Sequence, residues 1–119
     1  MVSVGVDIVE VKRIRRAIDR WGPQFLERIF TPAEIDYCLG KAREAESFAV
    51  RFAAKEAFAK ALKVGKASGW LEVEVTRGES PRPALLLTGA ARSLAGERRV
   101  DVSLSHIPTY AVAVVLVED

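Results

Sequence analysis

Hydrophobic residues alternate with small or polar residues at the beginning of the chain. The aliphatic side chains between positions 2 and 9 share one side of the strand that this period predicts, and these are Val2, Val4, Val6 and Ile8. Asp7 falls on the other side, next to Gly5. Because Gly5 has no side chain, a ligand or another backbone segment can approach the Asp7 carboxylate closely.

The period then changes to that of a helix between Glu10 and Trp21, where apolar residues recur every three or four positions. Gly22 and Pro23 end this predicted helix. A second helix is predicted from Pro32 to about Leu39, because Thr31 and Glu34 provide an N-cap and a capping box around a proline at the first helical position.

The strongest helical pattern runs from about residue 45 to 63, without an interrupting glycine or proline. Its apolar arc consists of Ala53, Ala54, Ala57, Phe58, Ala61 and Leu62. So many alanines predict that another element packs very close to this helix. Glu56, Lys60 and Lys63 lie together beside the arc, at spacings of four and three residues.

The remainder of the chain alternates short strands with turns. Strand-like segments cover 71–76, 84–87, 100–104 and 110–117, a short helix is predicted over 88–94, and the last two strands resemble a hairpin around 105–109. No linker or internal repeat divides the sequence. The pattern predicts one α+β domain over residues 1–119, with an antiparallel sheet packed on the long central helix.

Composition narrows the classes of protein that fit. Of 119 residues, 50% are hydrophobic, enough for a real core in one domain. The single cysteine, Cys38, rules out an intramolecular disulfide or a cysteine metal cluster. The net charge of +2 is too small to indicate a nucleic-acid-binding protein by itself. We expect a cytoplasmic protein without membrane association, since neither a signal segment nor a long apolar run is present.

Two carboxylates are candidates for chemistry, and each has an ordinary structural alternative. Glu56 could be a surface partner of Lys60, four residues further along the helix. Asp7 could cap the helix that follows its strand.

The sequence as a whole resembles the bacterial holo-acyl-carrier-protein synthases, which are the small members of the 4′-phosphopantetheinyl transferase superfamily. The resemblance runs nearly from end to end. It is carried by the blocks Gly5–Glu10, Phe30–Ile35, Arg51–Ala61, Trp70–Val75 and Ser103–His106. It implies the transferase fold and the transfer of 4′-phosphopantetheine from coenzyme A to a serine of apo acyl carrier protein, releasing adenosine 3′,5′-bisphosphate.

The resemblance also implies roles for the candidate residues. Asp7 and Glu56 would hold a Mg²⁺ ion that also binds the pyrophosphate of coenzyme A, and few oxygen ligands completed by water and phosphate suit this ion. Glu56 would in addition organise the attacking serine hydroxyl. Lys60 would meet the phosphates as a point charge and assist the leaving group.

Further contacts to coenzyme A are expected from the central helix and the hairpin. Arg51 and Lys55 share another arc of the helix and would reach the 3′-phosphate, unless they face water. His106, the only histidine, and Ser105 beside it belong to a block that favours contact with coenzyme A, although a residue at a hairpin can equally be structural.

The first helix is the expected docking surface for the acyl carrier protein. Arg13, Arg16 and Arg20 form a basic arc without acids on the same arc, and the carrier proteins of the family are acidic. Phe25 and Arg28 are further candidates. The alternative is an ordinary solvated helix face.

A strand with two apolar faces predicts that something must cover both of them. Val112, Val114 and Leu116 lie on one face of the segment 110–117, and the other face is equally apolar. The resemblance implies a homotrimer with each coenzyme A site between two subunits. In the alternative, a monomer, the central helix covers one face and the first helix the other.

Two competing functions remain. A hydrolase using Ser105 and His106 is disfavoured because adjacent strand residues point to opposite faces and no nucleophile-elbow glycines are present. A non-catalytic basic module that binds an acidic protein or nucleic acid would need neither Asp7 nor Glu56, and the chain lacks an aromatic stripe for nucleic-acid bases.

Overall fold

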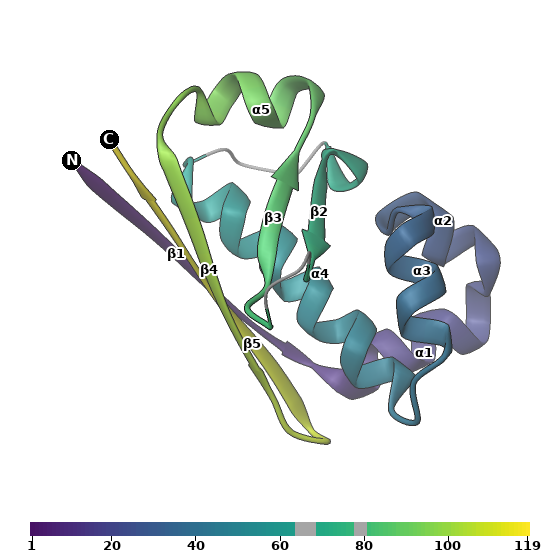
Figure 1. Ribbon diagram of the computed structural model, residues 1–119. Coiled ribbons are helices and arrows are strands. Elements are labelled where there is room, and N and C mark those ends of the chain that lie inside the picture. The colour runs from purple at the N-terminus through teal and green to yellow at the C-terminus, as the bar shows by residue number, and fades with distance from the viewer. Residues whose placement is uncertain (64–68, 78–80) are drawn as a thin grey trace.

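The computed structural model describes residues 1–63, 69–77 and 81–119. Most of the loop between the predicted helix of 45–63 and the strand-like segment 71–76, and part of the turn between 71–76 and 84–87, therefore lie outside the described residues. The elements follow one another as β1 Val2–Glu10, α1 Val11–Trp21, α2 Pro23–Ile29, α3 Pro32–Leu39, α4 Glu44–Ala61, the 3-10 turn η1 Trp70–Glu72, β2 Val73–Thr76, β3 Ala84–Leu87, α5 Gly89–Ala95, β4 Arg99–His106 and β5 Tyr110–Glu118 (Figure 1). The predicted α+β class is confirmed.

The strands form two antiparallel sheets. In the larger sheet β5 lies between β1 and β4, and β2 pairs with β3 in the smaller sheet. Asp7 of β1 is in register with Ala113 of β5, which in turn is in register with Leu104 of β4. The predicted hairpin is confirmed, because β4 and β5 pair from His106 and Ala111 onward.

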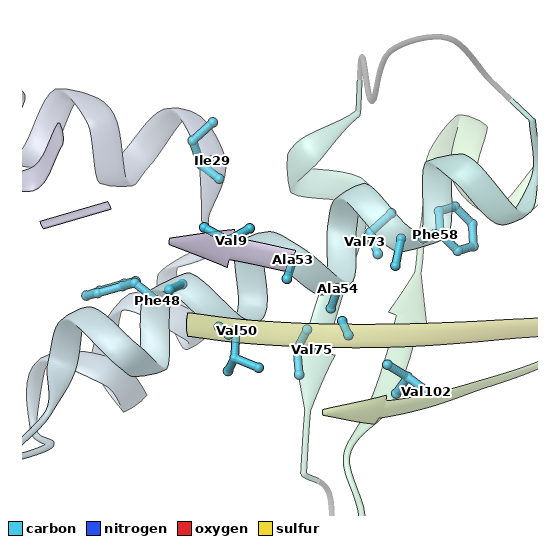
Figure 2. Close-up of a cluster of buried hydrophobic side chains, with 14 of the residues drawn as sticks. Val9, Ile29, Phe48, Val50, Ala53, Ala54, Phe58, Val73, Val75 and Val102 are labelled. Carbon is cyan, nitrogen blue, oxygen red and sulfur yellow. The ribbon is translucent and has the colours of Figure 1, made fainter. Parts of the chain in front are cut away.

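Helix α4 packs across the inner face of the larger sheet, and its alanines allow the close approach that the sequence predicts. Figure 2 shows Ala53 and Ala54 of α4 surrounded by side chains of both sheets, among them Val9, Val102 and Val75. The closest contact is at Gly5, where an added Cβ would overlap the Ala57 carbonyl oxygen and lie 2.6 Å from the Ala61 nitrogen. The segment expected to approach Gly5 is therefore the backbone of α4.

The two helices predicted before residue 40 are confirmed, and a third helix, α2, lies between them. Thr31 and Glu34 form the predicted capping box at the start of α3. Gly22 ends α1 with a φ of 54°, but Pro23 then begins α2, which the sequence pattern did not predict. A proline is well tolerated at the first helical position, so the same dipeptide ends one helix and starts another.

The outer face of the larger sheet is left uncovered by the described elements of this chain. Helices α1 to α4 and the smaller sheet all lie on the opposite side (Figure 1). The aliphatic residues of β1 are accordingly 52–65% exposed, and they are Val2, Val4, Val6 and Ile8. Helix α1 packs against α4 and α2, so it does not provide the second cover that the monomer alternative requires.

No helix among the described residues is long and apolar enough to cross a membrane.

Candidate active site

Asp7, Lys60 and Glu56 come together where β1 crosses α4. The Lys60 Nζ donates hydrogen bonds to the Asp7 Oδ1 at 2.9 Å and to the Val6 carbonyl oxygen at 3.0 Å. The Asp7 side chain is only 16% exposed, whereas that of Lys60 is 55% exposed. Lys60 thus approaches from solvent, and the Asp7 carboxylate is held against the helix by the close packing at Gly5.

Glu56 lies one helical turn before Lys60, and its carboxyl group interacts electrostatically with Asp7 and Lys60. Burial raises the pKa of Glu56 above its ordinary value, and the negative charge of Asp7 raises it further, while Lys60 and Arg13 oppose the shift. Two carboxylates therefore lie near enough to repel each other. Such a pair stabilises a bound cation.

The donors in this cluster fit Mg²⁺ bound together with a phosphate substrate. The described residues contain no group of three or more His, Cys, Asp or Glu side chains able to enclose a metal ion. Magnesium needs no such group, since it commonly takes one or two carboxylates and completes its shell with water and substrate phosphates. In this structure the Lys60 ammonium lies against the Asp7 carboxylate and balances its negative charge.

Lys55, the neighbour of Glu56, lies in the core. Its side chain is fully buried, and its Nζ donates to the Glu34 Oε1 at 2.8 Å, to the Trp70 carbonyl oxygen at 2.9 Å and to the Val73 carbonyl oxygen. All three ammonium hydrogens are used within the chain. This placement does not fit the expected contact to a phosphate, because reaching one would leave a buried carboxylate unpaired.

Arg51 lines a separate polar cavity of about 440 Å³. Its guanidinium lies 4.6 Å from the centre of the Tyr37 ring, and its Nη1 donates to the Ser47 carbonyl oxygen at 3.0 Å. The residue is only 4% exposed, and its buried Nε has no hydrogen-bond partner in the described structure. Further cations on the wall, Arg77 and Arg82, make the cavity suited to an anion.

His106 also lines this cavity, but Ser105 does not. The His106 Nδ1 lies 2.8 Å from the Glu46 Oε1. Ser105 is in register with Val112, on the outer face of the sheet. The two neighbours thus point to opposite faces, as expected of a strand, and they do not form a Ser–His pair.

The cavity and the Asp7 cluster lie on different sides of α4. Arg51 and Lys60 are nine positions apart, which is about two and a half turns and places their side chains on opposite sides of the helix. One chain therefore carries two separate groups of candidate residues.

The predicted basic arc on α1 is confirmed as a surface feature. Arg13, Arg16 and Arg20 are exposed, and none of them forms an ion pair within the part of the chain that the structure describes. Arg15, on another arc, pairs with Asp19 and Glu44 instead. Phe25 and Arg28 line a groove of about 410 Å³ between α1 and α2, together with Ala17, Trp21 and Gln24.

Some residues at these sites escaped the sequence analysis. Tyr37, Arg77 and Arg82 line the cavity, and Glu46 contacts His106 from the first turn of α4. None belongs to a recognisable local motif. Their contacts join segments far apart in the sequence. The one local signal was that Glu46 is an acid in the first turn of α4, where acids are common.

Comparison with known proteins shows the family to which this sequence and fold belong. The family model described as "4'-phosphopantetheinyl transferase superfamily" matches residues 3–115. The holo-[acyl-carrier-protein] synthase of Koribacter versatilis is 48% identical to this chain, and the match covers 100% of this chain and 99% of the relative. The synthase of Moorella thermoacetica is also 48% identical, and the match covers 99% of this chain and 94% of the relative. The crystal structure of the Neisseria meningitidis synthase superimposes with a TM-score of 0.87 at 32% identity, covering 100% of both chains. That of a Bacillus anthracis synthase in complex with CoA (3',5'-ADP) has a TM-score of 0.82 at 36% identity, covering 98% and 96%. The chain therefore belongs to the 4′-phosphopantetheinyl transferase superfamily, among its holo-[acyl-carrier-protein] synthases.

Proposed function

We propose that Asp7, Glu56 and Lys60 form the centre at which this transferase moves 4′-phosphopantetheine from coenzyme A to a serine of apo acyl carrier protein. The observation that carries the proposal is the Lys60 ammonium 2.9 Å from the Asp7 carboxylate, with Glu56 in the same field. This cluster combines acids that favour a cation with a cation that favours phosphate. Membership of a family of transferases argues against the non-catalytic alternative.

Asp7 and Glu56 are the residues that would hold Mg²⁺. A bound Mg²⁺ offsets the negative charge of the pyrophosphate and of the transition state of phosphoryl transfer. Asp7 is held in place by the packing of β1 on α4. Its carboxylate therefore needs little rearrangement to bind the ion.

Glu56 is suited to organise the serine hydroxyl of the carrier protein. Its carboxylate lies in the field of Asp7 and Lys60, and a carboxylate there can accept a hydrogen bond from the serine hydroxyl or from a water beside it. The hydroxyl oxygen attacks the β-phosphorus, its proton passes to Glu56 or to a water held there, and adenosine 3′,5′-bisphosphate leaves. Lys60 can turn from Asp7 towards the phosphates, since its side chain is half exposed.

The cavity around Arg51 and His106 is proposed to receive the adenosine bisphosphate part of coenzyme A. Its support is the buried guanidinium, whose Nε finds no hydrogen-bond partner among the described residues, in a cavity walled by further arginines. A relative from Bacillus anthracis was crystallised with CoA (3',5'-ADP). Lys55 and Ser105 are left out of this site because of their positions in the core and on the outer face.

The basic arc of Arg13, Arg16 and Arg20, with the groove of Phe25 and Arg28, is proposed to dock the carrier protein. Helix α1 begins at Val11, four residues after Asp7, and Arg13 acts electrostatically on Glu56. A partner seated on α1 would therefore present its serine near the carboxylates. An acidic carrier protein suits this surface by charge.

The active unit is proposed to be a homotrimer with each site shared by two subunits. Two observations support this: the uncovered aliphatic face of the larger sheet, and the separation of Arg51 from Lys60 across α4. Packing the outer faces around a threefold axis would bury that apolar surface. The cytoplasmic location stays a prediction.

The assignment is tested by mass spectrometry of apo acyl carrier protein incubated with this chain, coenzyme A and Mg²⁺. We expect the wild type to add the phosphopantetheine mass, and Asp7→Asn and Glu56→Gln each to lose at least about 100-fold in rate while remaining folded. Asp36→Asn and Glu44→Gln are matched controls that should retain the rate. Near-normal turnover of either site variant would overturn the assignment.

A further inference from the structure

Glu46 is a nearly buried carboxylate whose closest polar partner is the only histidine of the chain. Glu46 is 5% exposed, and its Oε1 lies 2.8 Å from the His106 Nδ1. Its Oε2 lies 3.7 Å from the Arg43 Nε. The three residues come from the start of α4 and the end of β4, elements far apart in sequence.

The two members of this pair differ in their relation to the cavity. His106 belongs to its wall, together with Arg51, Arg77 and Ser103, whereas Glu46 does not. Glu46 can therefore act on a molecule in the cavity only through His106. That is the arrangement of a group that orients a ligand-binding imidazole.

We propose that Glu46 is a positioning residue, which holds the Nδ1–H of His106 and so presents Nε2 to the adenosine bisphosphate part of coenzyme A. The inference rests on the proposed nucleotide site and adds the residue that prepares it. It assigns no contact between Glu46 and the nucleotide.

The argument follows from the hydrogen-bonding capacity of the two side chains. An ionised carboxylate can only accept, so the hydrogen between Glu46 and His106 must belong to Nδ1. In the neutral ring the other nitrogen, Nε2, then carries no hydrogen and accepts; in the protonated ring it donates. Either way the nitrogen left for a ligand is the same one. Arg43 supplies the opposite charge that a buried carboxylate requires.

The orientation of the ring is fixed by the same contact. His106 is the last residue of β4, and its side chain is 41% exposed. Such a side chain would otherwise sample several rotamers. Holding one of them before the ligand arrives reduces the entropy that binding must overcome.

The first test is nuclear magnetic resonance of the ¹⁵N-labelled protein, in which His106 gives the only imidazole signals. At a pH where the ¹⁵N chemical shifts show the neutral ring, long-range nitrogen–proton correlations distinguish the two tautomers. We expect Nδ1–H in the wild type and in the control Glu44→Ala, and a shift towards Nε2–H in Glu46→Ala. Nε2–H in the wild type, or no change in Glu46→Ala, would overturn the inference.

The second test measures binding of adenosine 3′,5′-bisphosphate by calorimetry. Removing one orienting hydrogen bond should weaken binding by about five- to tenfold in Glu46→Ala. Glu46→Gln should retain most of the affinity, because its amide oxygen can accept the same bond. Glu44→Ala removes an acid from the same helical turn and should bind as the wild type does. Equal losses in the Gln and Ala variants would show that the hydrogen bond is not the cause, and would overturn the inference.

The same titration separates failure of this inference from failure of the nucleotide site. If the bisphosphate binds the wild type without moving the His106 resonances, the cavity assignment and the inference are both wrong, and the assignment of Asp7 and Glu56 is unaffected. If the resonances move but Glu46→Ala binds like the wild type, the inference alone is wrong.

Discussion

Lys55 and Glu56 are adjacent in the sequence and differ in everything that matters for chemistry. One residue of helix turns the side chain by about 100°. That rotation points Lys55 towards Glu34 and the core and leaves Glu56 beside Asp7. A charged residue that is adjacent in the sequence to a site carboxylate, as Lys55 is to Glu56, therefore need not belong to the site.

At this scale the pKa of Glu56 predicts a conflict between stability and activity. A carboxyl pKa raised by burial means that the folded chain holds the proton more tightly than the unfolded chain. Ionisation of Glu56 therefore costs stability as the pH rises through the raised pKa. We expect Glu56→Gln, without Mg²⁺ at neutral pH, to raise the Tm by about 1–3 °C while abolishing transfer.

Differential scanning calorimetry between about pH 4 and pH 8 checks this prediction, because the difference should vanish below the unfolded-state pKa of about 4.3. Glu44→Gln, in the first turn of the same helix and next to Arg15 rather than another acid, should show no such gain. A lower Tm for Glu56→Gln at neutral pH would contradict the expected sign.

Among the elements, the packing of β1 on α4 decides where Asp7 lies. Gly5 lets the strand backbone approach Ala57 and Ala61 of the helix, and Asp7 follows two residues later on the same face. A methyl group at position 5 has no space, so the strand and helix would have to separate.

We expect Gly5→Ala to lower the free energy of unfolding by about 1–3 kcal/mol and to reduce transfer as well, because Asp7 moves with the strand. Gly40→Ala is the matched control, since an added Cβ there meets nothing closer than 4.0 Å. Urea unfolding and the carrier-protein assay measure the two effects. Unchanged stability of Gly5→Ala would mean that the packing is looser than described.

Helix α1 gives a second prediction at this scale. We expect Arg16→Glu to raise the KM for acyl carrier protein by about tenfold and that for coenzyme A by less than about twofold, with the loss growing at low salt. Arg92→Glu makes the same charge change on α5 and should leave both constants unchanged. Equal losses for the two substrates would indicate a structural role for Arg16.

At the scale of the whole molecule, the outer face of the larger sheet presents an apolar surface that the described elements leave uncovered. The exposed aliphatic residues of β1 continue onto Val114 of β5, so they form one face of the larger sheet. A second copy of the chain is our proposed cover for that face, and the opposite orientation of the two residue groups on α4 agrees with a site shared across the contact.

Subunit complementation tests this arrangement. Asp7→Asn and Arg51→Ala each disable a different half of the shared site, so each alone should be inactive or strongly impaired. Co-refolded mixtures should regain about one quarter of wild-type activity, because random mixing pairs two intact halves in that share of the interfaces of a cyclic trimer. Light scattering should give a trimer mass. A fully active monomer, or mixtures no more active than their components, would refute the shared site.

The order of elements was readable from the sequence because its causes are local. The strand period of Val2–Val9, the capping box at Thr31 and the unbroken alanine-rich helix act over a few residues, and the structure confirms each of them. The motif blocks also revealed the family, which comparison confirms. Helix α2 was missed because a Gly-Pro dipeptide is compatible with both an end and a start.

Tertiary structure alone decided which charged residues lie in the core and which face a ligand. Lys55 meets Glu34 across 21 positions, and His106 meets Glu46 across 60 positions. No local pattern encodes such contacts, since they depend on how strands and helices pack. A buried charge must find a partner wherever the fold brings one close, so burial and pairing, rather than residue type, set the role of each side chain.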